Sequence, residues 1–175
     1  MKKVLVVVDM QKDFIDGALG SPQAQAIVPN VVEKIRLYQD EGNDIVFTQD
    51  THFENYLETQ EGKYLPVIHC VEGTEGWEIP AELINEVNGF NGHNKNTFGS
   101  LALADVISEM KDIEEVELCG LCTDICVVSN ALILKAKLPE LKVTVDGKCC
   151  AGVSEESHKA ALLTMKMCQV NIINE

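Results

Sequence analysis

Short apolar runs alternate with longer segments of helical periodicity along most of the chain. The apolar runs cover residues 4–8, 45–48, 116–119, 143–145 and 170–173. They are almost continuous in Val, Ile and Leu, which is typical of strands covered on both faces. We therefore predict a buried strand at each of them, and the first of these strands ends at Asp9.

Helical periodicity fills most of the intervals between these runs. Apolar residues recur three or four positions apart within residues 27–38, 101–110, 127–134 and 155–167. Gly42 and Gly120 mark transitions at helix and strand ends. Strands that alternate with helices predict an α/β fold, with a parallel sheet and helices on both faces. Because 175 residues correspond to about one domain, we interpret residues 1–175 as a single domain.

The segment from Asp50 to Asn96 differs from the rest of the chain. Its periodicity is poor, and it carries Gly62, Pro66, Gly73, Gly76, Pro80, Gly89 and Gly92. Long irregular segments of compact domains are usually functional. The chain contains no G-x-G-x-x-G, P-loop or G-x-S-x-G motif, so the common nucleotide-binding and serine-hydrolase signatures are absent.

Charge and hydropathy exclude several classes of partner. The chain has 14 Lys and Arg against 28 Asp and Glu, a net charge of −14, which disfavours nucleic acids and anionic membrane surfaces. No stretch approaches the ~20 apolar residues of a membrane span. The first apolar run is also shorter than the ~7–15 residues of a signal-peptide core. We therefore expect a cytoplasmic protein whose seven cysteines are mostly free thiols.

The predicted strand ends carry the candidate chemistry. Ligands of open α/β sheets bind beyond the carboxyl ends of the strands. Asp9 follows the first strand, Asp50 and His52 follow the second, Lys95 follows a short strand near Gly92, and Cys126 follows the strand that ends near Gly120. An acid, a potential metal-binding pair, a lysine and a cysteine are therefore expected along one edge of the sheet.

Cys126 is the candidate nucleophile. Thr123 or Asp124 is a natural N-cap for the helix that follows, which would place Cys126 in a first helical turn that favours a thiolate. A free cysteine is most often a small buried apolar residue, and position alone leaves the two interpretations about even. Likewise, Asp9 could cap a loop and Lys95 could be a solvated surface residue. Together the three form a plausible unit in which Asp9 takes the thiol proton and the lysine balances the charge.

Asp50, His52 and His69 form a candidate metal site. The side chains of Asp50 and His52 point the same way in an extended chain, and three N/O ligands with open positions are typical of a divalent metal. Spacing alone slightly favours an ordinary hydrogen-bonded loop. His93 and His158 have no such neighbours. Cys119, Cys122 and Cys126 could instead hold zinc or an iron–sulfur cluster, although Cys119 falls inside a strand and no second C-x-x-C pair is present.

Five ordered segments contain the candidate residues, namely residues 8–14 (VDMQKDF), 48–52 (TQDTH), 69–76 (HCVEGTEG), 95–100 (KNTFGS) and 120–127 (GLCTDICV). Together they resemble the isochorismatase-like cysteine hydrolases, and within them the nicotinamidase/pyrazinamidase group. The resemblance extends from Val4 to about Ile173. It implies a three-layer α/β/α fold around a mostly parallel, Rossmann-like sheet of six strands.

The resemblance also implies a site. Its catalytic triad would be Asp9, Lys95 and Cys126, and its oxyanion hole the backbone N–H groups of Cys122 and Cys126, after a cis Leu121–Cys122 peptide bond. One divalent metal, zinc or else manganese or iron, would bind Asp50, His52 and His69, with Glu61 as a possible fourth ligand. In nicotinamidases this metal takes the pyridine nitrogen of the substrate, and Phe14 could stack on the ring.

The implied function is cysteine-dependent hydrolysis of a small carboxamide, nicotinamide-like, to an acid and ammonia through a thioester. The sequence departs from the group at Cys122, where Ala is common, at residues 65–68, which lack the usual aromatic residue, and at Ile125. An aliphatic or carbamoyl amide is therefore the alternative substrate. A thiol- and metal-binding protein without turnover is the alternative from another class. The expected partner is a small-molecule amide, and a homo-oligomer is possible.

Overall fold

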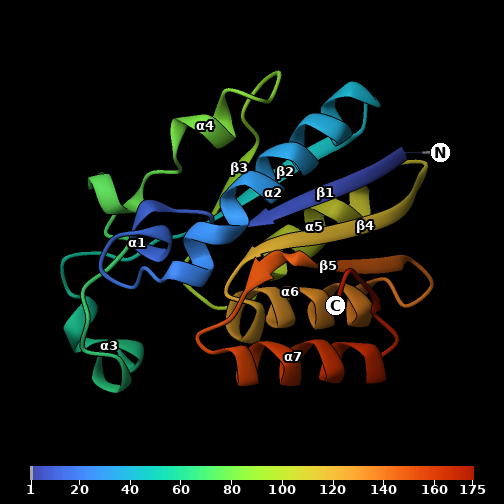
Figure 1. Cartoon of the computed structure of the whole chain (residues 1–175). Helices are drawn as coiled ribbons and strands as arrows, with labels where there is room; N and C mark the ends of the chain where they lie inside the picture. The colour runs from blue at the N-terminus through green and yellow to red at the C-terminus, as the bar shows by residue number, and fades with distance from the viewer. Residues whose placement is uncertain (1) are drawn as a thin grey trace.

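The computed structural model describes residues 2–175, which form a six-stranded parallel sheet flanked by helices (Figure 1). The strands are β1 (Lys2–Val8), β2 (Asp44–Asp50), β3 (Gly92–Lys95), β4 (Ile113–Leu121), β5 (Lys142–Ala151) and β6 (Asn171–Ile173). The α-helices are α1 (Lys12–Ile15), α2 (Pro22–Asp40), α3 (Gln60–Tyr64), α4 (Ala81–Ile84), α5 (Leu101–Glu109), α6 (Val128–Lys137) and α7 (Glu155–Met167). Single turns of 3₁₀-helix cover Tyr56–Glu58 and Glu75–Trp77, and a π-turn covers Thr123–Val127.

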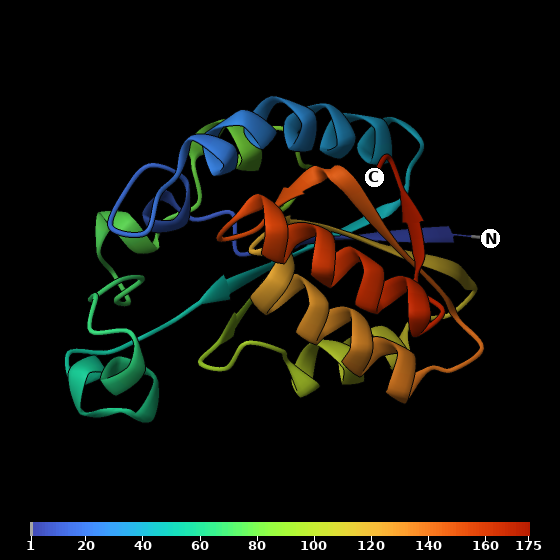
Figure 2. The same ribbon diagram turned by 60° about the horizontal axis from the view of Figure 1, so that its bottom comes forward.

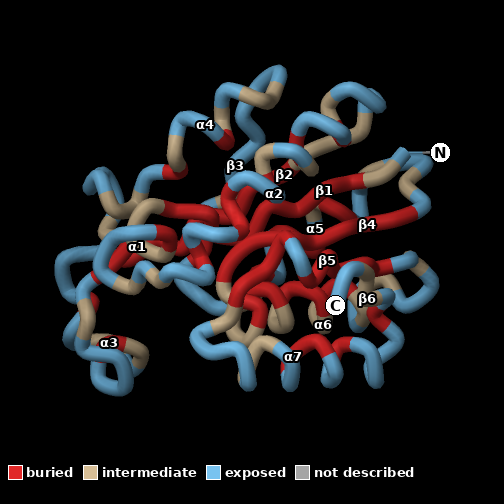
Figure 3. The backbone as a smooth tube through the Cα atoms, in the orientation of Figure 1, coloured by how far each residue is buried: buried red, intermediate tan, exposed pale blue. Residues whose placement is uncertain are grey.

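The helices form two layers with the sheet between them. Figure 2 shows α2 on one face of the sheet and α5, α6 and α7 on the other. The residues of β1 from Val4 to Val8 are fully buried, as expected for a central strand that is covered on both faces (Figure 3). The predicted three-layer α/β/α fold is therefore confirmed, and every strand pair in the sheet is parallel.

Strands β4 and β5 are longer than their apolar runs predicted. The reason is that both contain buried charged residues, which interrupt the hydrophobic pattern without ending the strand. Glu115 of β4, one residue before the apolar run, accepts a hydrogen bond from Thr144 of β5 and pairs with Lys142. Asp146 of β5, which directly follows the apolar run of that strand, lies 2.7 Å from Lys34 of α2. These contacts satisfy the carboxylates inside the fold, so the strands continue through them.

The strand order places a topological switch point at the centre of the sheet. The order is β3-β2-β1-β4-β5-β6, so the chain moves outward from β1 in one direction and from β4 in the other. Adjacent strands at such a point leave a crevice beyond their carboxyl ends. Gly120 makes the approach of β4 to β1 possible, because its φ is +118° and a Cβ there would lie 2.1 Å from the Val8 carbonyl oxygen.

The segment predicted to be irregular is built from short turns and connections. Between β2 and β3 it holds only α3, α4 and the two 3₁₀ turns. Figures 1 and 2 show the part around α3 projecting beyond the end of the sheet. In the portion of the chain that the structure describes, no helix combines the length and the apolar character that crossing a membrane requires.

Candidate active site

Asp9, Lys95 and Cys126 meet at the switch point. Asp9 directly follows β1, Lys95 ends β3, and Cys126 lies in the π-turn after β4. The Lys95 Nζ atom lies 2.6 Å from Asp9 Oδ2 and 3.6 Å from Cys126 Sγ. All three residues are buried. The fold therefore brings together the acid, the ammonium group and the thiol that were predicted to act as a unit, and the Lys95 side chain is not on the surface.

Burial controls the protonation of these three groups. It raises the pKa of the Cys126 thiol well above its usual value, an effect that Asp9 reinforces and Lys95 opposes. It also raises the pKa of Asp9, although Lys95 works in the opposite direction. The carboxylate of Asp9 in turn raises the pKa of Lys95 despite the burial of that lysine. The surroundings of Cys126 therefore oppose the thiolate that the start of a helical turn favours, and they stabilise the neutral thiol.

The hydrogen bonds that hold the turn with Cys126 differ from the predicted N-cap. Its N-cap position is Cys122, with no side-chain cap, so neither Thr123 nor Asp124 caps it. Thr123 instead hydrogen-bonds His158 Nδ1 of α7 at 2.7 Å, and the Asp124 carboxylate accepts the Val153 N–H. These two side chains tie the turn to α7 and to the loop before it. His158, which seemed isolated in the sequence, therefore supports the nucleophile turn.

The peptide bond between Leu121 and Cys122 is cis, which confirms the expectation from the family resemblance. The Cys122 carbonyl accepts the N–H groups of Ile125 and Val127 at 3.1 and 3.0 Å. Within residues 2–175, the Cys122 N–H itself finds no hydrogen-bond acceptor. It is therefore available to a ligand beside Cys126.

Asn130 is a buried residue that the sequence analysis missed. Its Oδ1 accepts the Ser100 N–H at 2.9 Å, and its Nδ2 donates to the Cys126 carbonyl at 2.8 Å and to the Phe98 carbonyl at 3.2 Å. It thus joins the turn that carries the thiol to the loop that follows Lys95. The sequence signal was an amide four residues after the cysteine, directly before the apolar residues 131–134.

We expect Asn130→Leu to lower kcat by roughly 10–100-fold, because small displacements of reacting groups have effects of this size. It should also lower the free energy of unfolding by about 1–3 kcal/mol for each backbone group left buried without a partner. Steady-state kinetics and urea denaturation measure the two effects. Asn30→Leu is the matched control, since the amide of Asn30 also donates to a backbone carbonyl, at 2.9 Å, but on the exposed surface. Equal kinetics for both variants would contradict the role given to Asn130.

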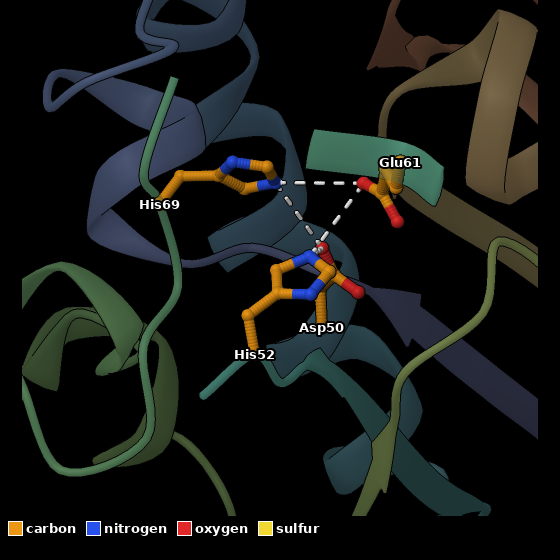
Figure 4. A group of neighbouring side chains, drawn as sticks. All are labelled: Asp50, His52, Glu61 and His69. Atoms are coloured by element: carbon orange, nitrogen blue, oxygen red, sulfur yellow. Dashed lines mark hydrogen bonds and ion pairs between the residues drawn. The ribbon is translucent and has the colours of Figure 1, made fainter. Parts of the chain in front are cut away.

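A second group of side chains lies next to Lys95. Asp50, His52, Glu61 and His69 each direct one ligand atom toward the others, and these atoms all lie within 4.8 Å of one another (Figure 4). The shortest contact joins His52 Nε2 to Asp50 Oδ2 at 3.0 Å. Glu61, the uncertain fourth member, comes from α3 and faces both histidines at 3.6 and 3.8 Å. The four groups are therefore placed as a metal site requires.

Neighbouring residues orient this cluster. His69 Nδ1 bonds to the Val67 carbonyl at 2.8 Å, which directs its Nε2 inward. Gln11, also missed in the sequence, is fully buried and bridges the backbone N–H and carbonyl of Asp50 at 2.7 and 2.8 Å. Burial alone would raise the pKa of Asp50, but hydrogen bonds from the two histidines and the charge of Lys95 outweigh it and lower that pKa.

A cavity of about 320 Å³ opens beside both groups of residues. Cys126 and Cys122 line it, together with Asp50, Glu61 and His69. Apolar side chains form most of the rest of its wall, including Phe14, Leu19, Leu65, Leu121, Ile125 and Val153. Phe14 also makes an edge contact with the ring of His69, at 5.5 Å between the centroids. A small molecule in this cavity can therefore touch the thiol and the four-ligand cluster at once.

Comparison with known proteins identifies the family. The model of the isochorismatase domain matches residues 3–174. The chain belongs to the isochorismatase family. It is 29% identical to the isochorismatase family protein PncA of Bacillus subtilis, with 93% of each chain covered. It is 24% identical to the nicotinamidase/pyrazinamidase of Mycobacterium tuberculosis, with 98% of each covered.

The solved structures agree with this assignment. The structure of the pyrazinamidase of Pyrococcus horikoshii in complex with zinc superposes with a TM-score of 0.86 at 29% identity, and both chains are covered completely. The relatives and the family model together support a hydrolase that acts on amides. The resemblance stated from the five sequence segments is therefore confirmed.

Proposed function

We propose that the protein is a cysteine-dependent amidohydrolase that converts a small carboxamide, with nicotinamide as the first candidate, to the acid and ammonia. The observation that carries the proposal is the placement of the Asp9–Lys95–Cys126 group and the four-ligand cluster on one small cavity. The relatives named as nicotinamidases and pyrazinamidases support the choice of substrate. We also propose a cytoplasmic location, a compartment in which the seven free cysteines would stay reduced.

In the first step Asp9 accepts the proton of the Cys126 thiol while the sulfur attacks the amide carbon. A neutral resting thiol requires such a base, and Asp9 is the carboxylate beside it. The transfer moves a proton within the Asp9–Lys95–Cys126 group, so the net charge of the buried site does not change. Lys95 stays protonated and lies 2.6 Å from Asp9 and 3.6 Å from the sulfur, so it stabilises the negative charge on either group.

The later steps use the same residues. The N–H groups of Cys122 and Cys126 stabilise the oxyanion, a contribution of about 3–4 kcal/mol per donor in comparable sites. Asp9 returns its proton to the amide nitrogen, the C–N bond breaks, and ammonia leaves a thioester on Cys126. Water then attacks the thioester carbon, and Asp9 accepts a proton of that water. The C–S bond breaks, Asp9 returns this proton to the Cys126 sulfur, and the carboxylic acid is released from the free thiol.

The residues present fit a divalent metal. Two imidazole nitrogens and two carboxylate oxygens suit zinc, manganese and iron, and their inward orientation leaves room for a ligand from the cavity. Asp50, His52, Glu61 and His69 would hold the ion, which when bound supplies a Lewis acid for a lone pair of the substrate, such as a ring nitrogen. Phe14 would pack against that ring.

We expect His52→Ala and His69→Ala to weaken zinc binding at least ~100-fold, because even outer residues of metal sites change affinity by about 10–100-fold. Isothermal titration with zinc measures this without any substrate. His93→Ala is the matched control, since His93 lies outside the four-ligand cluster. Iodoacetamide should still label Cys126 in both cluster variants. Wild-type zinc affinity in either of them would remove that histidine from the site.

Ammonia release from a panel of amides tests the proposed function. The panel contains nicotinamide, pyrazinamide, an aliphatic amide and an N-carbamoyl amino acid, each with zinc, manganese or iron supplied in turn. Preference for the aromatic amides supports the proposal, and preference for the last two supports the same chemistry on the alternative substrates. No ammonia from any amide, with equal iodoacetamide labelling of several cysteines, would support the protein without turnover and refute the proposal.

A further inference from the structure

A second hollow adjoins the cavity beside Cys126. This hollow, of about 700 Å³, is lined on one side by the segment around α3 and on the other by Asn96 and Thr97, which follow β3. The two hollows share four lining residues, namely Glu61, Leu65, Phe98 and Ile125. They are thus adjoining spaces separated by a few side chains. Leu65 and Phe98 are partly exposed, so the boundary between the hollows is at the surface.

The second hollow lies in the direction in which a bound amide would point. With the amide carbon at Cys126, the acyl part of the substrate extends toward the four-ligand cluster, because Asp50, Glu61 and His69 line the same cavity. Glu61 and His52 of that cluster also line the second hollow. An acyl group that continues past Glu61 and Leu65 would therefore enter the second hollow.

The lining of the second hollow indicates what it accepts. Phe53 and Tyr64 present exposed aromatic rings, 53% and 85% accessible, and Asn55, Thr59 and Gln60 add neutral hydrogen-bonding groups. No Lys or Arg is among the residues that the structure places around it, and Glu61 is the carboxylate there. An anionic group would find no Lys or Arg there to pair with, whereas an uncharged ring can pack on the aromatic side chains.

We propose that the second hollow is a substrate subsite for an uncharged aromatic extension on the acyl side of the amide. This inference rests on the proposed amidohydrolase function and names a larger substrate class for the same site. The reaction is unchanged, since the amide C–N bond is cleaved by water and ammonia is released.

Three amides that differ in the size and charge of the group on the acyl side test the subsite with the zinc-loaded enzyme. They are nicotinamide, 5-phenylnicotinamide and 5-(4-carboxyphenyl)nicotinamide. We expect 5-phenylnicotinamide to be hydrolysed with a kcat/KM at least equal to that of nicotinamide, and the carboxylated analogue to be at least tenfold poorer than 5-phenylnicotinamide. A wild-type enzyme that hydrolyses nicotinamide but rejects 5-phenylnicotinamide would overturn the subsite and leave the proposed function intact.

Two substitutions obstruct the subsite from different positions. Leu65→Trp narrows the boundary between the hollows, and Asn55→Trp fills the second hollow at a residue that makes no capping hydrogen bond. Each should lower the kcat/KM ratio of 5-phenylnicotinamide to nicotinamide at least tenfold. Leu57→Trp is the matched control, because Leu57 is similarly exposed on the adjacent 3₁₀ turn but lines neither hollow. An unchanged ratio in both variants would contradict the proposal.

Binding measured without turnover tests the subsite separately from the amidohydrolase function. In the Cys126→Ala enzyme, calorimetry should show 5-phenylnicotinamide binding at least as tightly as nicotinamide, and Asn55→Trp in that background should weaken only the phenyl compound, by at least tenfold. Such binding in a protein whose wild type releases no ammonia would refute the amidohydrolase function and keep the subsite. Equal affinities with and without Asn55→Trp would refute the subsite alone.

Discussion

Replacement of Cys126 by alanine or serine should reduce turnover at least ~10³-fold, the scale on which nucleophile substitutions act. Alanine removes the attacking atom, and a serine hydroxyl is a weaker nucleophile that the same carboxylate would have to deprotonate. The fold should persist, because removing one buried atom group costs only about 1 kcal/mol. Ammonia release measures the turnover, and thermal unfolding measures the stability.

The matched control is Cys168→Ala, since Cys168 is exposed and lies outside the site. It should retain wild-type rates and stability. Mass spectrometry after rapid quenching should detect an acyl group on Cys126 in the wild type and none in Cys126→Ala. Residual activity within tenfold of the wild type in the alanine variant would eliminate Cys126 as the nucleophile.

Asp9→Asn should be nearly as damaging, with a loss of at least ~10³-fold in kcat, because an amide cannot accept the thiol proton. The substitution also leaves the Lys95 ammonium group without its partner at 2.6 Å in a buried site. Breaking a buried ion pair costs about 3–5 kcal/mol, so the variant should unfold at lower urea concentration.

Asp146→Asn is the control that distinguishes loss of the catalytic base from loss of a buried partner of a lysine. Asp146 is a buried carboxylate that lies 2.7 Å from the Lys34 ammonium group, away from the cavity that holds Cys126. It should therefore lower stability while kcat stays within about threefold of the wild type. Equal loss of kcat in the two variants would show that Asp9 acts through folding alone.

The pH profile provides an independent readout of Asp9. The base must be ionised, so kcat/KM falls as the pH falls through the pKa of Asp9. Because burial raises this pKa above the ordinary 3.8, the acidic limb should lie at a higher pH than an exposed aspartate would give. The limb should disappear from the residual activity of Asp9→Asn, and a limb that persists unchanged would assign it to another group.

Much of the fold and the candidate site could be predicted because they depend on local patterns. The Val-rich run from Val4 to Val8 is typical of a buried strand, and parallel strands bring their carboxyl ends to one edge. Asp9, Lys95 and the loop with Cys126 follow such ends, so their convergence required only the strand assignments. The same reasoning brought Asp50 and His52 to that edge.

Other features depend on contacts between distant segments, which no local pattern records. Glu115 and Asp146 look like interruptions of β4 and β5, and only partners on other elements, Lys142 and Lys34, allow them to be buried. Glu61 reaches the histidines because the segment around α3 folds back over them. Asn130 likewise gains its role from a loop about thirty positions earlier in the chain.

The tertiary structure also changes which form of the Cys126 thiol is favoured. Its place at the start of a helical turn favours a thiolate, since local dipoles stabilise that charge. The folded chain instead buries the sulfur beside the carboxylate of Asp9, and desolvation raises its pKa. The sequence by itself therefore determined which groups meet at the sheet edge. Only the surrounding structure shows in which direction their pKa values are shifted, because the cost of a charge depends on all the atoms that replace water around it.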